Sequence, residues 1–329
     1  MPHGATILAP LGLSLSDTEV QFFREADPWG FILFARNVET PDQLRALTDD
    51  LRTAVGRHAP IFIDQEGGRV QRMRAPHWRE YLPALDQMQR ASDPIRAQWL
   101  RNRLIAAELM AVGIDGNCAP LADLLEPETH PVLANRLYGN NVEAVADAAR
   151  TCAEAFRAGG VLPVLKHLPG YGRAHVDSHV DVPRVSASIT ELWDRDFRPF
   201  VDLNDLPIGM TAHVVYEAID LDQPATLSAK MIDLIRREIG FDGLLMTDDI
   251  SMGALSGSLS DRTTGAITAG CDIVLHCNGA MLEMQDVVAA AGTLTADGMR
   301  RADHALTTRQ PASPIDISTC AAELEALLA

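Results

Sequence analysis

The chain has 329 residues, 47% of them hydrophobic, so it is long enough to bury a sizeable core. Its formal net charge of −17 argues against nucleic acid as a partner, because few cations are left to neutralise phosphates. An anionic substrate would need a local basic pocket. The five cysteines are dispersed, odd in number and without a CxxC pair, which is typical of a reduced chain.

The N-terminal stretch MPHGATILAPLG has no Lys or Arg before its apolar run, so it does not resemble a secretory signal. No run of about 18 apolar residues follows. We therefore expect a cytoplasmic protein with no membrane partner.

Short apolar runs alternate with amphipathic segments along the chain. Thr40, Asn141 and Ser228 have the chemistry of helix N-caps, and each precedes a stripe of apolar residues at helical spacing. The predicted strands are 5–12, 30–34, 61–64, 113–120, 161–167, 208–215, 243–249 and 271–277.

Eight strands with interleaved helices predict a parallel α/β sheet, and eight is the number that closes a (β/α)8 TIM-type barrel. A doubly wound open sheet is the main rival. It is disfavoured because no GxGxxG follows the first strand and no phosphate-binding lysine motif occurs. We predict a single domain over 1–329, in which 309–316 is a surface connection before a short C-terminal helix.

Polar residues follow most of the predicted strands, and in such a barrel the active residues gather where strands end. Each has a structural alternative: the Asp248-Asp249 pair could cap a helix, Lys166 could pair with a carboxylate, and His167 could be a core histidine. Asp177 and His179 are two residues apart, so in extended chain they point the same way, as an orienting aspartate and a proton-transfer histidine would.

Two reaction classes could use these residues. Metal-assisted hydrolysis is weakly supported, because no HxH follows the first strand and no HExxH occurs. Glycoside cleavage needs an ionised carboxylate, a proton shuttle and groups that hold sugar hydroxyls. Asp248, His179 and a set of polar residues meet that need; the set is Asp64, Arg72, Arg136, Lys166 and His167.

Several segments appear in an order that resembles the bacterial β-N-acetylhexosaminidases of glycoside hydrolase family 3, the NagZ type. The resemblance covers about residues 5–280. The segments are GFILFARN, FIDQEGGRVQRM, NCAPLADL, NRLYG, KHLPGYGRAHVDSH, MTAHVVY, ATLS and LLMTDDISMGAL.

The resemblance implies a retaining mechanism in which Asp248 is the nucleophile, His179 the general acid/base and Asp177 its partner. It implies that Asp64, Arg72, Arg136, Lys166 and His167 hold an N-acetylglucosamine unit. It also implies a muropeptide substrate, since the family releases N-acetylglucosamine from 1,6-anhydro-N-acetylmuramoyl peptides in cytoplasmic peptidoglycan recycling.

No cofactor or metal is implied, and we expect a monomer. Two positions depart from the family pattern: Leu168 stands where Phe is common and Tyr171 where His is common. Two alternatives stay open, an N-acetylglucosaminide phosphorylase that uses phosphate as acceptor and a non-catalytic sugar-binding paralogue.

Overall fold

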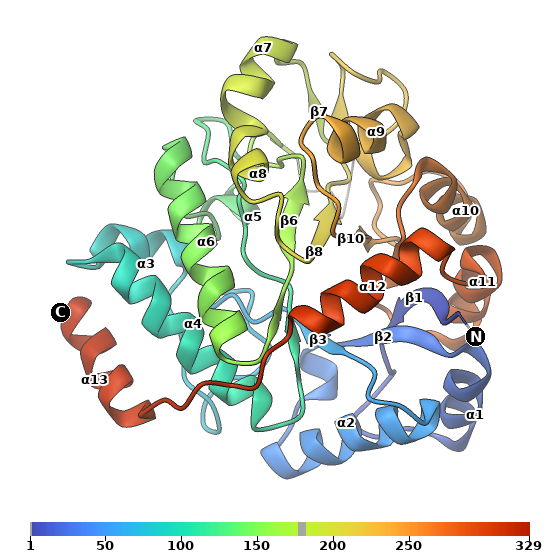
Figure 1. The fold of residues 1–329 in the computed structure, drawn as a ribbon, viewed down its shortest axis with the longest axis horizontal. Helices are drawn as coiled ribbons and strands as arrows, with labels where there is room; N and C mark the ends of the chain where they lie inside the picture. Colours follow the sequence, from blue (N-terminus) through green and yellow to red (C-terminus); the bar gives the residue numbers. More distant parts are fainter. Residues whose placement is uncertain (1, 177–181) are drawn as a thin grey trace.

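Parallel strands form the centre of the molecule. The structure is a computed structural model that describes residues 2–176 and 182–329 (Figure 1). Within these residues, nine parallel strands form one sheet in the order β5-β4-β3-β2-β1-β11-β10-β8-β6. They are β1 (Gly4–Leu8), β2 (Pro28–Leu33), β3 (Ile61–Ile63), β4 (Gly116–Asn117), β5 (Leu162–Pro163), β6 (Leu165–Leu168), β8 (Ile208–Thr211), β10 (Leu244–Asp249) and β11 (Ile273–His276). A short pair, β7 (Arg184–Val185) and β9 (Val215–Tyr216), lies apart from them.

The sheet closes on itself. β5 and β6 stand at opposite ends of the strand order, yet only Val164 separates them in the chain. β5 pairs with β4 and β6 pairs with β8, so this one stretch joins both edges of the sheet. Counted as one strand, β5 and β6 bring the total in the sheet to the eight predicted strands, and the predicted barrel is confirmed.

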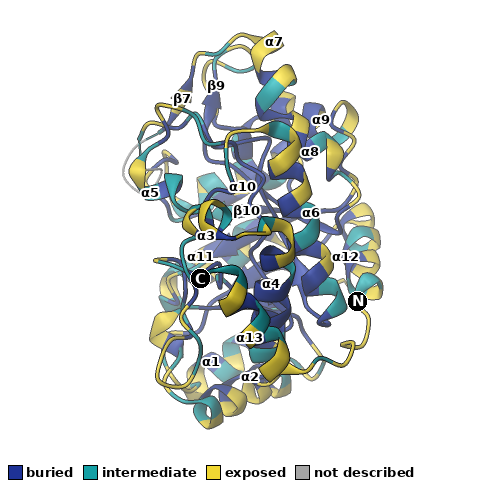
Figure 2. Ribbon diagram, turned by 90° about the vertical axis from the view of Figure 1, so that its left-hand side faces the viewer, coloured by how far each residue is buried: buried dark blue, intermediate teal, exposed yellow. Residues whose placement is uncertain are grey.

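Side chains alternate between the barrel interior and the surrounding helices, as the period of two in a strand requires. Ile7, Phe62 and Leu244 pack together inside, whereas their neighbours Leu8 and Ile63 pack in a separate cluster on the outer side. Figure 2 shows the strands buried at the centre and the helices exposed mainly on their outer faces.

Helices surround the barrel. They are α1 (Asp17–Ala26), α2 (Pro41–Val55), α3 (Ala84–Arg90), α4 (Pro94–Met110), α5 (Pro131–Ala134), α6 (Val142–Ala158), α7 (Ile189–Glu191), α8 (Arg198–Asp202), α9 (Ala229–Arg237), α10 (Leu259–Ala269), α11 (Met281–Ala291), α12 (Ala296–Thr308) and α13 (Ile317–Leu327). Short turns of other helix types occur at η1 (Ala35–Asn37), η2 (Leu192–Asp196) and η3 (Ala225–Leu227).

The predicted helix starts are confirmed. The side chains of Thr40, Asn141 and Ser228 each accept a backbone N–H three residues on, at the starts of α2, α6 and α9. Such a cap satisfies a donor that has no partner within the helix, and it contributes about 1 kcal/mol.

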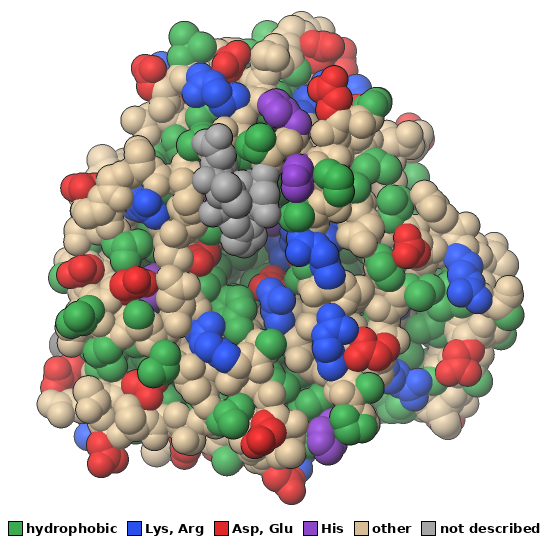
Figure 3. All heavy atoms as spheres, turned by 180° about the vertical axis from the view of Figure 1, so that it is seen from behind, with side chains coloured by type: hydrophobic (Ala, Val, Ile, Leu, Met, Phe, Trp, Pro, Cys, Tyr) green, Lys and Arg blue, Asp and Glu red, His purple; other side chains and the backbone are tan. Residues whose placement is uncertain are grey.

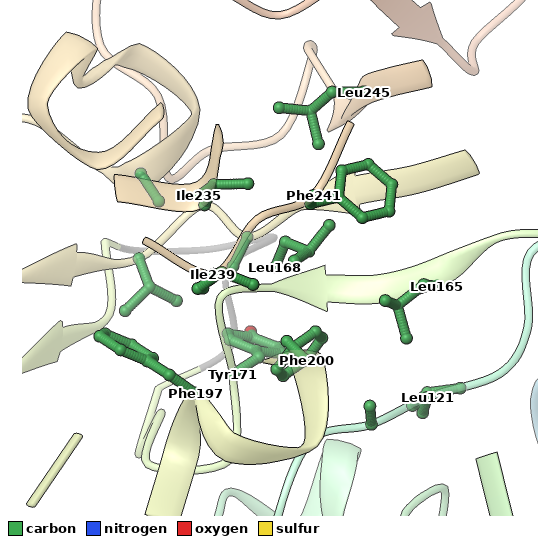
Figure 4. Packing of buried hydrophobic residues seen from close by; sticks show 14 of the residues in the cluster. Leu121, Leu165, Leu168, Tyr171, Phe197, Phe200, Ile235, Ile239, Phe241 and Leu245 are labelled. Carbon is green, nitrogen blue, oxygen red and sulfur yellow. The ribbon is translucent and has the colours of Figure 1, made fainter. Parts of the chain in front are cut away.

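A large apolar cluster packs β6, β8 and β10 against the helices outside them. Figure 4 shows Leu165 and Leu168 of β6 beside Phe200 of α8 and Phe241, which follows α9. Each of these side chains is fully buried. Burial of a large apolar side chain stabilises the fold by roughly 1.5–3 kcal/mol, so this cluster holds β6 rigidly in place.

The C-terminal segment connects as predicted, with residues 309–316 leading over the surface to α13. Arg103 of α4 donates from Nη2 to the Ser313 carbonyl at 2.7 Å, and α13 packs on α4. None of the helices in the described part of the chain is long and apolar enough to span a membrane.

Candidate active site

A pocket of about 260 Å³ opens at the carboxyl ends of the barrel strands. Six of the eight predicted site residues line it: Asp64, Arg72, Arg136, Lys166, His167 and Asp248. The other two, Asp177 and His179, lie outside the described residues. The pocket is smaller than the roughly 300–1,000 Å³ typical of sites for drug-sized ligands, and this size suits one sugar unit.

The two aspartates that end β10 have different surroundings. Asp249 accepts from the backbone N–H and the hydroxyl of Ser251 at 3.1 and 2.7 Å, so it stabilises the turn after the strand. Asp248 accepts only the Asp249 N–H, at 2.8 Å on Oδ1, among the described hydrogen bonds. Its Oδ2 lies 3.9 Å from His167 Nε2. Asp249 therefore has the cap-like role, and the Asp248 carboxylate is free to contact a ligand in the pocket.

Asp248 is held in its ionised form. Burial would raise the pKa of this carboxyl, but the nearby His167 and His213 outweigh it and hold the pKa below its ordinary value. An ionised, partly exposed carboxylate at the base of a pocket can act as a nucleophile.

His213 supports the end of β10 from behind. One ring nitrogen, Nε2, lies 3.0 Å from the Asp249 carbonyl, and the other lies 2.7 Å from Thr226 Oγ1. A carbonyl only accepts, so Nε2 carries the proton. Burial lowers the pKa of His213, and its ring fixes the backbone next to Asp248.

Two consecutive residues of β6, Lys166 and His167, both line the pocket, although neighbours in a regular strand point to opposite faces. The pairing of β6 with β8 shifts register between Lys166 and Leu168. The backbone of β6 is therefore irregular at the point where both side chains face the pocket.

A chain of alternating charges surrounds Lys166. Its Nζ lies 3.0 Å from Asp64 and 2.7 Å from Glu66. Asp64 also accepts from Arg72 at 3.1 Å, and Glu66 accepts from Arg136 through two bonds of 2.8 and 2.9 Å. Nε of Arg72 is buried and has no hydrogen-bond partner within residues 2–176 and 182–329.

The pKa values in this chain follow from the pairing. Burial would raise the pKa of both carboxyls, but Lys166 and Arg72 hold that of Asp64 well below its ordinary value. Arg136 and Lys166 lower the pKa of Glu66 to about 2. Burial would lower the pKa of Lys166, yet Glu66 and Asp64 raise it. All members are therefore charged at neutral pH.

Some residues of the site were not predicted. Glu66 holds two predicted sugar-binding cations, and the buried Asp123 contacts His167 at 2.8 Å. Phe34 and Tyr171 line the pocket. Both carboxylates were visible as polar residues near strand ends, but the sequence carries no signal that says which cation each would meet.

Other polar strand ends serve the scaffold. Asn117 is fully buried and exchanges hydrogen bonds with the backbone of Gln65 at 2.9 and 3.0 Å. His276 contacts Glu283 of α11 at 3.0 Å, outside the residues that line the pocket. His175 is exposed and lies at a separate hollow.

The pocket is locally basic although the chain is acidic. Arg69, Arg72, Arg136 and Lys166 line it. Figure 3 shows Lys and Arg side chains around a hollow on this face of a chain with a net charge of −17. Among the described side chains, no three from His, Cys, Asp and Glu lie close enough together to hold a metal ion.

Comparison with known proteins places this site in a family. The family model described as "Glycosyl hydrolase family 3 N terminal domain" matches residues 13–307. The chain belongs to glycosyl hydrolase family 3. It is therefore a glycoside hydrolase that acts on carbohydrate.

Relatives of this family 3 glycosidase carry a common name. A beta-hexosaminidase of Alkalilimnicola ehrlichii is 39% identical over 285 residues, which is 83% of this chain and 81% of that protein. The chain is also similar to the NagZ structure of Neisseria gonorrhoeae in complex with N-trifluoroacetyl-D-glucosamine, with 29% identity, a TM-score of 0.88, and 100% and 99% of the two chains covered. A β-N-acetylglucosaminidase of Paenibacillus has a TM-score of 0.86 at 27% identity; 98% of this family 3 chain aligns with 66% of that longer one.

Proposed function

We propose that this protein is a retaining β-N-acetylglucosaminidase that forms a glycosyl-enzyme on Asp248. One observation carries the proposal most directly: an ionised carboxylate lies in a sugar-sized pocket, and no group of residues 2–176 or 182–329 donates a hydrogen bond to its Oδ2. Similarity to beta-hexosaminidases supports the choice of sugar.

The rest of the pocket supplies groups that suit a sugar. Asp64, Lys166 and Arg72 offer an acceptor and donors in fixed positions, because they are paired with one another and largely buried. Sugar hydroxyls both donate and accept, so such a mixed set can hold several of them at once. We assign Arg136 and His167 to the same role.

The proton shuttle is proposed from the resemblance alone. His179 would act as general acid/base with Asp177 as its partner. A histidine suits this work because its unperturbed pKa of about 6.5 lies near neutral pH, whereas a carboxylic acid must be shifted by burial to serve there.

We propose that the natural substrate is a 1,6-anhydro-N-acetylmuramoyl peptide that carries terminal N-acetylglucosamine, and that the reaction serves peptidoglycan recycling in the cytoplasm. We further propose that residues 1–329 act as one catalytic domain and as a monomer. Light scattering at working concentration tests the last point, since a mass of twice 35.7 kDa would contradict it.

Turnover of a chromogenic N-acetylglucosaminide tests the activity. The wild-type protein should release the chromophore, and Asp248→Ala should lose nearly all turnover while keeping its fold. Asp233→Ala is the matched control, because Asp233 is an exposed helix residue paired with Arg237. Near-normal activity of folded Asp248→Ala would remove Asp248 as the nucleophile.

A series of leaving groups tests His179. Replacement by Ala should slow substrates with poor leaving groups most, because activated ones need no protonation. An equal loss on all substrates would contradict the role. Parallel reactions with and without phosphate identify the acceptor, and a sugar phosphate as the main product would show a phosphorylase.

A further inference from the structure

Asp123 lies behind the pocket, on the segment that follows β4, and is fully buried. It is absent from the residues that line the pocket. Three groups meet its carboxylate: the His167 ring at Nδ1 (2.8 Å), the His167 backbone N–H (3.2 Å) and the Tyr171 backbone N–H (2.7 Å). All of them belong to the end of β6 and the turn that follows.

The proton on the His167 ring can be placed from these contacts. Oδ1 accepts the two backbone N–H groups, and we take Oδ2 as the acceptor for the ring, since an ionised carboxylate only accepts. The ring nitrogen that meets Oδ2, Nδ1, then carries a proton. The opposite nitrogen, Nε2, faces the pocket side and lies 3.9 Å from Asp248 Oδ2.

The two carboxylate oxygens of Asp123 have different partners. Oδ2 meets the ring, while Oδ1 accepts both backbone N–H groups. These amides bracket a tight turn in which the Gly170 N–H donates to the His167 carbonyl at 2.7 Å. One carboxylate thus links the orientation of a pocket histidine to the first turn of the loop.

We propose that Asp123 is a positioning residue for the glycosidase reaction. It keeps the His167 proton on Nδ1, so that Nε2 is the atom that meets a substrate hydroxyl beside Asp248. Asp123 also fixes the start of the loop after β6, through the His167 and Tyr171 backbone N–H groups, relative to the His167 ring. The kinetic part rests on the proposed function, whereas the proton assignment does not.

Asp123→Asn separates this role from simple stabilisation. The amide oxygen can still accept the two backbone N–H groups, but the amide NH2 then faces Nδ1. The His167 ring must then accept a hydrogen bond from this NH2 group at Nδ1 and carry its own proton on Nε2. Asp123→Ala is less informative, because it leaves several buried donors without an acceptor and is expected to impair folding.

The test is 15N NMR of protein labelled at its ten histidines, with the His167 signals identified by their loss in His167→Gln. Wild-type His167 should show a protonated Nδ1, and Asp123→Asn should move the proton to Nε2. The kcat/KM of Asp123→Asn should fall by between about tenfold and a hundredfold, by analogy with the hydrogen-bond partners of metal-binding histidines. The melting temperature should stay near that of the wild type.

Asp272→Asn is the control, because Asp272 is equally a buried aspartate but pairs with Arg236 and Arg301 away from the pocket. It should leave the His167 signals and kcat/KM unchanged. The proposal is overturned if wild-type Nδ1 carries no proton, if Asp123→Asn does not move it, or if the proton moves and kcat/KM stays the same. The NMR experiment needs no substrate, so its result is independent of the proposed activity.

Discussion

Glu66 shows how one buried residue can organise a site that it does not line. Its carboxylate holds Lys166 on one side and Arg136 on the other, and both cations line the pocket. Without Glu66, Arg136 would lose its bidentate partner, and Lys166 would keep only Asp64, which also pairs with Arg72.

The sequence allowed the pocket-lining residues to be predicted better than their supports. Lys166, His167 and Asp248 follow apolar strands and belong to a recognisable motif. Glu66 and Asp123 lie in loops, which lack the two-residue period of a strand and the 3.6-residue period of a helix. The direction of their side chains could therefore not be predicted. Their roles became visible only once the partners were close in space.

Glu66→Gln should make the protein less stable at neutral pH, by about 3–5 kcal/mol, because it breaks a buried ion pair. The difference should shrink as pH falls. The pKa of Glu66 is lowered from 4.5 to about 2 in the folded state, so its stabilisation is complete above the unfolded value and is lost as pH falls toward the folded one.

Urea unfolding of both proteins from about pH 5 to about pH 3 measures this effect. Glu323→Gln is the matched control, since Glu323 makes a bidentate pair with Arg96 on the surface, where such pairs contribute little. A gap between wild type and Glu66→Gln that does not change with pH would contradict the assignment.

Among the elements, the helix starts could be predicted from local chemistry, but strand lengths could not. The predicted strand 113–120 has only two residues in the ladder, Gly116–Asn117. Side chains add to this short ladder, because the Asp115 carboxylate accepts the Ile61 N–H and the Asn117 amide oxygen accepts the Gln65 N–H. Such side-chain bonds leave no trace in hydrophobic periodicity.

The loop after β6 approaches the segment after β4 very closely at Gly172. A Cβ at this position would lie 1.8 Å from the Leu124 carbonyl oxygen, a backbone atom that cannot move aside easily. The Gly172 carbonyl in turn accepts from Thr129 at 2.6 Å. The glycine is therefore a packing requirement of this contact.

Gly172→Ala should displace the loop and lower kcat/KM, by as much as about a hundredfold, because small misplacements near a reacting centre are costly. Steady-state kinetics on the chromogenic substrate measures the loss. Gly12→Ala is the control, since a Cβ there meets nothing within 4 Å. Equal kinetics for the two variants would show that the contact at Gly172 does not matter.

Across the whole molecule, the pocket and the main structural ion cluster occupy opposite ends of the barrel. Asp115 precedes β4 and is buried, with Arg52 at 3.1 Å and Arg309 in close contact. It ties α2 and the C-terminal segment to the barrel floor. This ion cluster thus stabilises the barrel at a place remote from the pocket.

The barrel and its closure could be predicted by counting strands, but the break within the fifth predicted strand could not. Closure depends on the break at Val164, where one stretch changes partners from β4 to β8. Leu162, Val164 and Leu165 are apolar and buried. Pro163 lacks a backbone N–H, but neither it nor the hydrophobic pattern says that the chain changes partners there.

Asp115→Ala should lower the free energy of unfolding by about 3–5 kcal/mol, because two arginines lose a buried partner. Its kcat/KM should match the wild type at temperatures where both are folded. Asp205→Ala removes an exposed partner of Arg150 and should change stability by less than about 1 kcal/mol. A large loss of kcat/KM in folded Asp115→Ala would contradict the separation.

We propose that Asp248 becomes covalently bound to the sugar. Mass spectrometry of peptides after reaction with a fluorinated N-acetylglucosaminide, whose glycosyl-enzyme breaks down slowly, tests this directly. We expect one added glycosyl group on the peptide that contains Asp248, and none in Asp248→Ala. A glycosyl group on another residue, or turnover of the same reagent with no adduct on the protein, would contradict it.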